Sequence, residues 1–448
     1  MSASTDQSDS QGGEAYKRRL VLVGAVLLYN VALTLLLPLI LFYFLWRALS
    51  DRGYASGYRQ RLGWVNGMHT RPIWLHCASV GEVNASAPLL QKLQKRFFFT
   101  ALLFSCLTPT GKDRLQAVCP NHTVNYLPID WPPFLLLFFL RVRPCALILV
   151  ERDLWPNLLL FCRLFDIPVA VVNARMNEGS LQSYLRIDRL LSPLLRRVYV
   201  VAQEEEDAAR FKQLGVCPER MVVAGNLKFD ISISEPEKQL VLDYRNSTHA
   251  DGHRFTWLAA STHRGEDEVV LDVHRRLLEK HPRALLVLAP RHPERFQSVA
   301  EQAEVAGLSV VRASNGGFDK LQAETQVLLI DRMGELFTSF GVAEIAFIGG
   351  SLVPVGGHNA LEAAVWACPV LSGPHVYNAR ATADGLHAAG ALQWVMDGDE
   401  LFQALDDAAA NTDELQQRGE SARRYLESKA GATDDTVEVV KSMWEQAQ

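Results

Sequence analysis

The sequence predicts two doubly wound α/β domains that face each other across a cleft, preceded by a transmembrane helix. Short apolar runs, typical of buried parallel strands, alternate with helical patterns in both halves of the chain. A polar segment, residues 231–253, separates the halves and is predicted to be a linker. An uncharged apolar run, residues 20–46, exceeds the ~20 residues that are needed to span a bilayer.

Composition narrows the class of protein. The 448 residues suffice for two or three domains, and with 48% hydrophobic and 21% charged residues they can form large cores. The formal net charge of −5 argues against a nucleic-acid partner. The seven cysteines are scattered without a C-x-x-C spacing, which disfavours a disulfide framework or a structural zinc site and fits a reducing cytosol.

The N-terminal region is predicted to attach the chain to a membrane. Residues 1–19 begin with a Ser-, Asp- and Gly-rich stretch and are predicted to be disordered, and residues 20–46 form the anchor. A cleaved signal peptide is an alternative, but the apolar run is too long for one and lacks a clear cleavage site. Asn30 and Pro38 interrupt the run, so a tilted or half-inserted helix is a second alternative. The positive-inside rule alone does not set the orientation, because basic residues flank both ends: Lys17, Arg18 and Arg19 before the run, and Arg47, Arg52, Arg59 and Arg61 after it.

Two further segments have membrane-like composition. Residues 53–64, GYASGYRQRLGW, are basic and aromatic and are predicted to rest on lipid headgroups. The apolar residues 134–140 are too few to span a bilayer and fit a helix face, either in the core or on the membrane.

The first domain, residues 47–230, carries polar clusters directly after its predicted strands. Ligands of doubly wound sheets bind at the carboxyl ends of strands, so these clusters hold candidate site residues. Glu82 could be a general base for a hydroxyl group, or a first-turn acid favoured by the helix dipole. Glu151 is expected to face the cleft, with a structural salt bridge as the alternative, and Lys228 could stabilise charge on a leaving phosphate or be a solvated surface cation. The predicted strands are 72–77, 97–106, 146–150, 168–173, 198–202 and 222–224, with a helix at 83–97.

The second domain, residues 254–430, repeats the alternation. Arg291 and His292 follow its second strand, and arginine binds phosphate or carboxylate in a bidentate manner. The predicted strands are 255–260, 284–289, 327–330, 345–348 and 369–372, and the predicted helices include 266–280, 360–367 and 414–448.

A glycine-rich stretch, GGSLVPVGGHNALE at residues 349–362, follows the buried strand 345–348. Its four glycines let the backbone turn sharply and approach a ligand closely. A helix starting at the end of this stretch would offer unpaired N–H groups and a positive dipole end to a phosphate. Asn359 and Glu362 lie about one turn apart, a spacing suited to binding sugar hydroxyls. The stretch matches neither Walker A nor G-x-G-x-x-G, and the alternative is a loop that only turns the chain.

Two metal patterns are weak. His358 and Glu362 stand at i, i+4, but no third ligand is evident, so no metal site is predicted. Asp397-Gly398-Asp399 has the D-x-D form of metal-dependent sugar transferases, but no nucleotide-binding signal adjoins it, so it is interpreted as a turn.

Taken together, the motifs resemble the 3-deoxy-D-manno-octulosonic acid (Kdo) transferases of lipid A biosynthesis. The resemblance covers about residues 29–378 and implies the GT-B architecture, with two Rossmann-like domains and a C-terminal helix, residues 431–448, that crosses back to the first domain. It also implies transfer of Kdo from CMP-Kdo to a lipid A precursor such as lipid IVA, with inversion at the anomeric carbon and without a bound metal or other cofactor. The motifs, in order, are ASVGEV, ERDLWPN, NARMNEGSLQSY, GNLKFD, ASTHRGEDE, LAPRHPERF, MGEL and GGSLVPVGGHNALEAA.

The same resemblance implies roles for individual residues. Glu82 would be the base that deprotonates the acceptor hydroxyl, and Glu151 and Lys228 would stabilise the transition state. Because CMP-sugars are cytosolic, the catalytic domains would lie on the cytoplasmic face of a bacterial inner membrane, behind a single-pass anchor. The residues that would hold CMP are Pro290, Arg291, Met333, Gly334, Glu335, Asn359, Ala360, Leu361 and Glu362.

The sequence departs from the family pattern at three places. ERDLWPN replaces the usual E-T-E-L-W-P-N, which leaves the role of Asp153 open. Ala360 stands where proline is common, and Cys77 replaces a small apolar residue. The alternatives are another GT-B transferase or an epimerase that uses a UDP-sugar, and a non-enzymatic nucleotide-binding protein.

Overall fold

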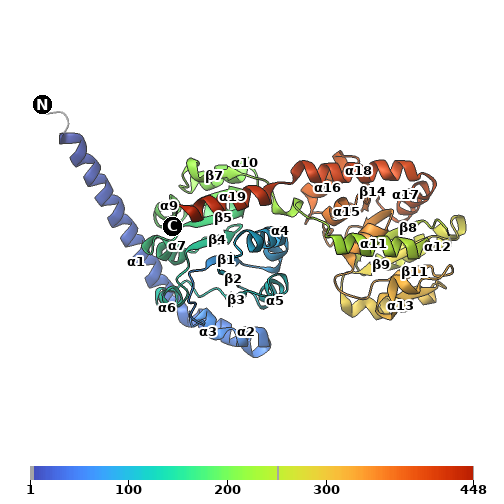
Figure 1. Ribbon diagram of the computed structural model, residues 1–448, viewed down its shortest axis with the longest axis horizontal. Helices are drawn as coiled ribbons and strands as arrows, with labels where there is room; N and C mark the ends of the chain where they lie inside the picture. The colour runs from blue at the N-terminus through green and yellow to red at the C-terminus, as the bar shows by residue number, and fades with distance from the viewer. Residues whose placement is uncertain (1–4, 250–251, 447–448) are drawn as a thin grey trace. The chain divides into compact units, whose positions relative to one another are not determined.

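The computed structural model describes residues 5–249 and 252–446, and the chain folds into two compact units (Figure 1). Unit 1 comprises Met1–Asp230 and Ala430–Gln448, and unit 2 comprises Ile231–Lys429. Each unit is an α/β structure built on one parallel sheet, as the alternating pattern predicts.

The sheet of unit 1 has the strand order β3-β2-β1-β4-β5-β6-β7. Its strands are β1 (Ile73–Cys77), β2 (Leu102–Cys106), β3 (Thr123–Tyr126), β4 (Ala146–Val150), β5 (Val169–Ala174), β6 (Tyr199–Ala202) and β7 (Met221–Val223). The helices are α1 (Thr5–Ser50), α2 (Arg52–Ser56), α3 (Tyr58–Arg61), α4 (Val80–Arg96), α5 (Pro109–Val118), α6 (Pro132–Val142), α7 (Pro156–Leu164), α8 (Glu178–Leu185), α9 (Asp188–Leu195), α10 (Glu205–Gln213), η1 (Pro218–Arg220), η2 (Leu227–Phe229) and α19 (Ala432–Glu445).

Apolar layers cover both faces of this sheet, so its central strands are buried throughout. Side chains of β4 alternate between the two layers: Leu147 and Leu149 belong to one core, and Ile148 and Val150 belong to the other. A strand that is buried on both faces has a continuous run of apolar residues in the sequence. For this reason β4 can be predicted from ALILV.

The sheet of unit 2 has the strand order β10-β11-β9-β8-β12-β13-β14. Its strands are β8 (Thr256–Thr262), β9 (Leu285–Pro290), β10 (Val310–Arg312), β11 (Val327–Leu329), β12 (Ile345–Ile348), β13 (Val370–Ser372) and β14 (Leu392–Trp394). The helices are α11 (Glu235–Thr248), α12 (Asp267–Lys280), η3 (Pro293–Arg295), α13 (Phe296–Val305), η4 (Ala313–Asn315), η5 (Gly317–Lys320), α14 (Leu336–Val342), α15 (Leu361–Val365), α16 (Arg380–Ala388), α17 (Gly398–Ala410) and α18 (Thr412–Lys429).

Two segments differ from the sequence-based expectation. Residues 231–253 are not an open linker, because α11 fills most of that range and belongs to unit 2. A capping box starts this helix: Ser234 Oγ accepts a hydrogen bond from the N–H of Glu237, and the Glu237 carboxylate accepts one from the N–H of Ser234. The predicted disorder of residues 1–19 is also wrong from Thr5 onward, where α1 begins, and residues 1–4 lie outside the described residues.

The strands that the sequence does not predict are β3, β10 and β14, and all three lie at a sheet edge. Edge strands need less apolar surface than central ones, so they leave a weak signal in the sequence. The second predicted strand is also too long, because Phe97 ends α4 and β2 begins at Leu102.

The C-terminal end of the chain returns to unit 1 as a separate helix. The predicted helix 414–448 breaks at Gly431, whose φ of 117° suits glycine, and α19 follows the break. The Asp230 carboxylate accepts hydrogen bonds from the N–H groups of Gly431 (2.6 Å) and Thr433 (2.5 Å), which caps α19. Val440 and Met443 then pack into the core of unit 1, against α4 and the sheet.

Candidate active site

The chain reverses its winding direction in unit 1 between β1 and β4, which pair in parallel. Ligands of open α/β sheets bind outside the carboxyl ends of strands at such a switch point. Glu82 lies in the first turn of α4, directly after β1, and Glu151 to Asp153 follow β4. The structure therefore brings the two predicted acids of this unit to neighbouring positions at the binding edge of the sheet.

Glu82 is held by the start of its own helix. Ser79 caps α4 and accepts a hydrogen bond from the N–H of Glu82 (3.4 Å), while the Glu82 carboxylate accepts one from the N–H of Ala78 (2.6 Å). Burial raises the pKa of Glu82 to about 8; the Ala78 hydrogen bond opposes the rise, and the negative charges of Asp153 and Glu151 add to it. At neutral pH this carboxyl is therefore mostly in its acid form, and its base form predominates above about pH 8.

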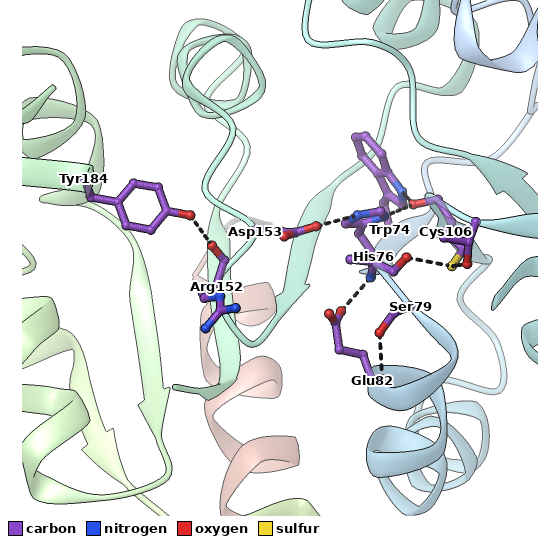
Figure 2. Close-up of polar contacts among 11 residues, drawn as sticks. Trp74, His76, Ser79, Glu82, Cys106, Arg152, Asp153 and Tyr184 are labelled. Carbon is purple, nitrogen blue, oxygen red and sulfur yellow. Dashed lines mark hydrogen bonds and ion pairs between the residues drawn. The ribbon is translucent and has the colours of Figure 1, made fainter. Parts of the chain in front are cut away.

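A buried chain of polar side chains fixes Asp153 beside this position. The Asp153 carboxylate lies 3.3 Å from Nε2 of the fully buried His76, as Figure 2 shows. His76 Nδ1 lies 2.9 Å from Oγ of Ser105, which also accepts a hydrogen bond from the indole N–H of Trp74 (2.8 Å). On the other side, the Tyr184 hydroxyl donates to the backbone carbonyl of Arg152 (2.7 Å), so the turn after β4 is held from two directions.

Backbone strain marks the ends of two strands in unit 1. Glu151 has a φ of 61° and Asn173 a φ of 51°, both in the left-handed region that non-glycine residues rarely adopt. Such conformations cost free energy and tend to gather at functional sites.

Asn173 also positions the loop that carries Lys228. Its side-chain oxygen accepts a hydrogen bond from the N–H of Leu227 (3.1 Å), and the Asn226 side chain accepts one from the N–H of Lys228 (3.0 Å). The short helix η2 formed here packs against α4, so the Lys228 loop returns to the helix that carries Glu82. Lys228 itself is exposed.

Unit 2 has its own switch point, between β8 and β12. Glu266 follows β8, is fully buried, and accepts four backbone hydrogen bonds: from His263 (2.9 Å), Gly350 (2.7 Å), Ser351 (3.0 Å) and Leu352 (3.0 Å). A side chain at Gly349 would collide with the backbone of Ser261, and Gly350 has a φ of 69°, so both glycines are needed for this arrangement.

This arrangement corrects the predicted phosphate site. The first N–H groups of the glycine-rich loop bind Glu266 and are not free for a ligand. The helix that follows is α15, only five residues long and without a side-chain cap, so its dipole adds little. The N–H groups of Gly350, Ser351 and Leu352 are therefore not available to an anion.

Three histidines gather at the same edge. Nε2 of His263 lies 2.9 Å from Nε2 of His358, and the His292 ring contacts the His263 ring edge-on. A hydrogen bond between two such nitrogens needs one proton between them. Burial lowers the pKa of His358 to about 4, and the charge of a protonated His263 would lower it further. Burial also lowers the pKa of His263, while the negative charge of Glu266 opposes that shift.

The residues predicted to hold a nucleotide lie at or after the carboxyl ends of β9, β11 and β12 in unit 2. Pro290 ends β9, and Arg291 follows it with an exposed side chain. Glu362 lies in α15, and burial raises the pKa of its carboxyl. The other members are Met333, Gly334 and Glu335 after β11, and Asn359, Ala360 and Leu361 at the start of α15.

Among the residues that the structure describes, no group of three or more His, Cys, Asp or Glu side chains could hold a metal ion. Asp397 caps α17 by accepting hydrogen bonds from the N–H groups of Asp399 and Glu400, both at 3.0 Å. The D-x-D pattern is thus accounted for by a helix start.

Comparison with known proteins identifies the family. A family model described as 3-deoxy-D-manno-octulosonic-acid transferase (kdotransferase) matches residues 56–231. The chain is 34% identical, over 420 residues, to the 3-deoxy-D-manno-octulosonic acid transferase of Haemophilus influenzae, covering 92% of this chain and 97% of that one. The chain belongs to the Kdo transferase family. It is also 33% identical to the Bordetella pertussis 3-deoxy-D-manno-octulosonic acid transferase, covering 83% and 87% of the two chains.

The fold agrees with this assignment. The UDP-GlcNAc 2-epimerase of Neisseria meningitidis, solved with UDP-GlcNAc bound, superposes with a TM-score of 0.56 over 83% of this chain and 100% of that chain. At 14% identity this likeness shows the fold alone. The Kdo transferase described here is therefore a glycosyltransferase of the GT-B fold with an N-terminal apolar helix.

Glu266 and His76 lie at the binding edges of the two sheets and make contacts there that the sequence does not predict. Glu266 stands in the ASTHRGEDE motif, but nothing in the spacing indicates that its carboxylate folds back onto a loop more than eighty residues away. An acid directly after a strand end, at the same place as Glu82, is the signal that could have indicated it.

Glu266→Gln tests whether this carboxylate organises the glycine-rich loop. Glutamine offers one acceptor oxygen in place of two, so we expect a loss of about 1–3 kcal/mol in the free energy of unfolding and faster amide hydrogen exchange at residues 349–353. Glu268→Gln removes an exposed acid two residues away and serves as the control. Unchanged exchange in Glu266→Gln would contradict this role.

Proposed function

We propose that this enzyme moves Kdo from CMP-Kdo to a lipid A precursor such as lipid IVA, with inversion at the anomeric carbon, on the cytoplasmic face of a bacterial inner membrane. The family assignment supports Kdo as the transferred sugar. One observation of this structure carries the chemical part of the proposal: a half-buried acid at a switch point, Glu82, with a pKa of about 8.

In the proposed reaction, the ionised Glu82 takes the proton from a glucosamine hydroxyl of the acceptor. The hydroxyl oxygen forms a bond to the anomeric carbon of Kdo, and the bond from that carbon to the phosphate oxygen of CMP breaks. CMP leaves with the electron pair of the broken bond. Because the hydroxyl oxygen attacks the face of the anomeric carbon opposite the leaving CMP, the configuration at that carbon is inverted. The bonds and electrons of this transfer balance without an oxidant, a reductant or a cofactor. CMP-Kdo takes part as a substrate.

Two further residues of unit 1 are assigned to the transition state. The strained turn after β4 holds Glu151 in place at the binding edge, where its charge favours the positive character that develops at the anomeric carbon. Lys228 is an exposed cation on a loop fixed by Asn173, and we assign it to the negative charge that develops on the leaving CMP.

Binding of CMP is assigned to unit 2. Arg291 offers a guanidinium for the phosphate, and Glu362 and Asn359 offer acceptors and a donor for the ribose hydroxyls. Pro290, Met333, Gly334, Glu335, Ala360 and Leu361 complete the proposed nucleotide site. The His263–His358 pair adjoins Gly350 and borders the same edge.

The membrane partner follows from the acceptor. The acyl chains of a lipid A precursor stay in the bilayer, so its sugar head must meet the enzyme at the headgroup level. An apolar helix at Leu20–Leu49 supports attachment at that level. In the basic aromatic segment, residues 53–64, Tyr54 and Arg61 are buried, so only its exposed members, such as Arg59 and Trp64, are available to headgroups.

A donor panel tests the proposed reaction. Purified enzyme with lipid IVA is expected to give a product with added Kdo when CMP-Kdo is supplied, and no product with CMP-sialic acid or UDP-GlcNAc, as read by mass spectrometry. The product mass also gives the number of Kdo units. Transfer or epimerisation with a UDP-sugar, and none with CMP-Kdo, would overturn the proposal in favour of another GT-B activity.

Glu82→Gln tests the base. The amide keeps the shape and can still accept the Ala78 hydrogen bond, so CMP binding measured by calorimetry should be unchanged while kcat falls about 10²–10⁴-fold. Glu205→Gln, an exposed first-turn acid of α10, is the matched control and should transfer normally. A Glu82→Gln enzyme that turns over at the wild-type rate would exclude Glu82 as the base.

A further inference from the structure

One side of the apolar helix α1 packs against the rest of unit 1 between Leu22 and Arg47. Figure 1 shows it passing beside α7 and α6 and ending next to α3 and α2. Leu22, Ala25 and Val26 pack against the core of unit 1 near one end. Near the other end, Phe44 contacts the Tyr54 ring, and the Arg61 guanidinium lies 4.5 Å from the centre of the Phe44 ring.

A polar stripe fixes the middle of the helix. The Tyr29 hydroxyl donates to the buried Asp130 carboxylate (2.9 Å). Asn30 and Asn157 exchange two side-chain hydrogen bonds, at 3.1 and 2.9 Å.

The stripe continues one turn further along α1. Thr34 Oγ1 accepts a hydrogen bond from the Trp131 indole (3.1 Å). The polar interruptions in the apolar run at residues 29, 30 and 34 are therefore docking contacts with unit 1.

The length of this docked stretch matters for how the helix meets a membrane. The attachments run from Leu22 to Arg47, whose guanidinium contacts the Tyr54 hydroxyl (3.4 Å). At a rise of 1.5 Å per residue, these two contacts are about 37 Å apart along the axis. The hydrocarbon layer of a bilayer is about 30 Å thick. If α1 crossed this layer upright, the segments of unit 1 that pack against it would also lie within the hydrocarbon, across its full thickness.

Those partners are not suited to hydrocarbon. α1 packs against α9, whose first turn carries the exposed charges Asp188 and Arg189. Charged groups in the bilayer core are costly unless they pair or face water. In contrast, the side of α1 that faces away from unit 1 is broadly apolar and exposed, with Leu28, Leu35, Leu39, Phe42 and Leu49 between 65% and 82% accessible.

Basic residues stand at both ends of the apolar run, Lys17 to Arg19 before it and Arg47, Arg52 and Arg59 after it. An upright crossing would place one of these groups on the outer face, against the positive-inside rule. A helix whose two ends both stay on the cytoplasmic side keeps both basic groups of the sequence on the side that this rule favours.

We propose that α1 is an in-plane membrane element: it lies along the cytoplasmic leaflet with its apolar side in the lipid, and both of its ends stay on the side of unit 1. The proposal is an alternative to the single-pass anchor expected from the sequence, and it rests on the proposed inner-membrane location. The occupant of the exposed apolar face is a leaflet that contains anionic lipid. Leu136 and Leu140 are further exposed apolar side chains, on α6, the helix that begins next to the Trp131–Thr34 contact.

The accessibility of terminal tags to protease tests the in-plane arrangement of α1 without measuring catalysis. The in-plane arrangement can therefore be refuted while the proposed reaction still stands. The full chain carries one epitope before Met1 and another after Gln448, and protease is added to intact spheroplasts of a Gram-negative host. We expect both tags to be protected in intact cells and both to be cleaved after lysis. Cleavage of the N-terminal tag alone in intact spheroplasts, or cleavage of both, would overturn the proposal; a host single-span protein with an outer tag is the positive control.

The depth of the helix gives a second, independent measurement. Spin labels at Leu28→Cys, Leu35→Cys and Phe42→Cys, in a background in which the half-buried Cys145 and Cys217 are replaced by serine, are placed in vesicles with anionic lipid. An in-plane helix gives similar depths at all three sites. A steady change in depth of about 1.5 Å per residue from Leu28 to Phe42 would show a crossing helix and contradict the proposal.

Discussion

The hydrogen bond from the N–H of Ala78 to the Glu82 carboxylate is the contact on which the proposed chemistry depends. It holds the acid at the carboxyl end of β1, while burial keeps its pKa near 8. Glu266 offers an instructive comparison, because it also follows the strand next to a switch point and also folds back onto the strand end. Glu266 accepts four backbone hydrogen bonds and is fully buried, which suits a structural anion. With one such bond and partial exposure, Glu82 keeps acceptor capacity for a substrate proton.

The parallel topology of each sheet determines which loops can carry site residues. In both units the chain winds away from a central strand pair in opposite directions, so two loops open at the carboxyl edge with no helix crossing between them. Unit 1 places carboxylates in these loops, and the His76–Asp153 contact ties the end of β1 to the turn after β4. Unit 2 places glycines, histidines and Arg291 there.

Much of this could be predicted from the sequence because buried parallel strands are continuous apolar runs and functional residues follow them directly. Glu82, Glu151, Arg291 and the glycine-rich loop lie at strand ends, as expected. Other features depend on contacts between distant residues, which periodicity does not reveal. The Glu266 contact with Gly350 and the Asn30 contact with Asn157 are of this kind. The edge strands carry too little apolar surface to be recognised, and the helix after the glycine-rich loop is too short to act as the predicted phosphate site.

The central claim is that Glu82 accepts the proton of the acceptor hydroxyl, and the pH dependence of kcat/KM tests it most directly. Because burial raises the pKa of Glu82 to about 8 and only the ionised form is a base, log kcat/KM should rise with a slope of one up to about pH 8 and then level off. The residual activity of Glu82→Gln should lack this rise. A wild-type profile that is flat from pH 6 to pH 9, or the same rise in Glu82→Gln, would contradict the account.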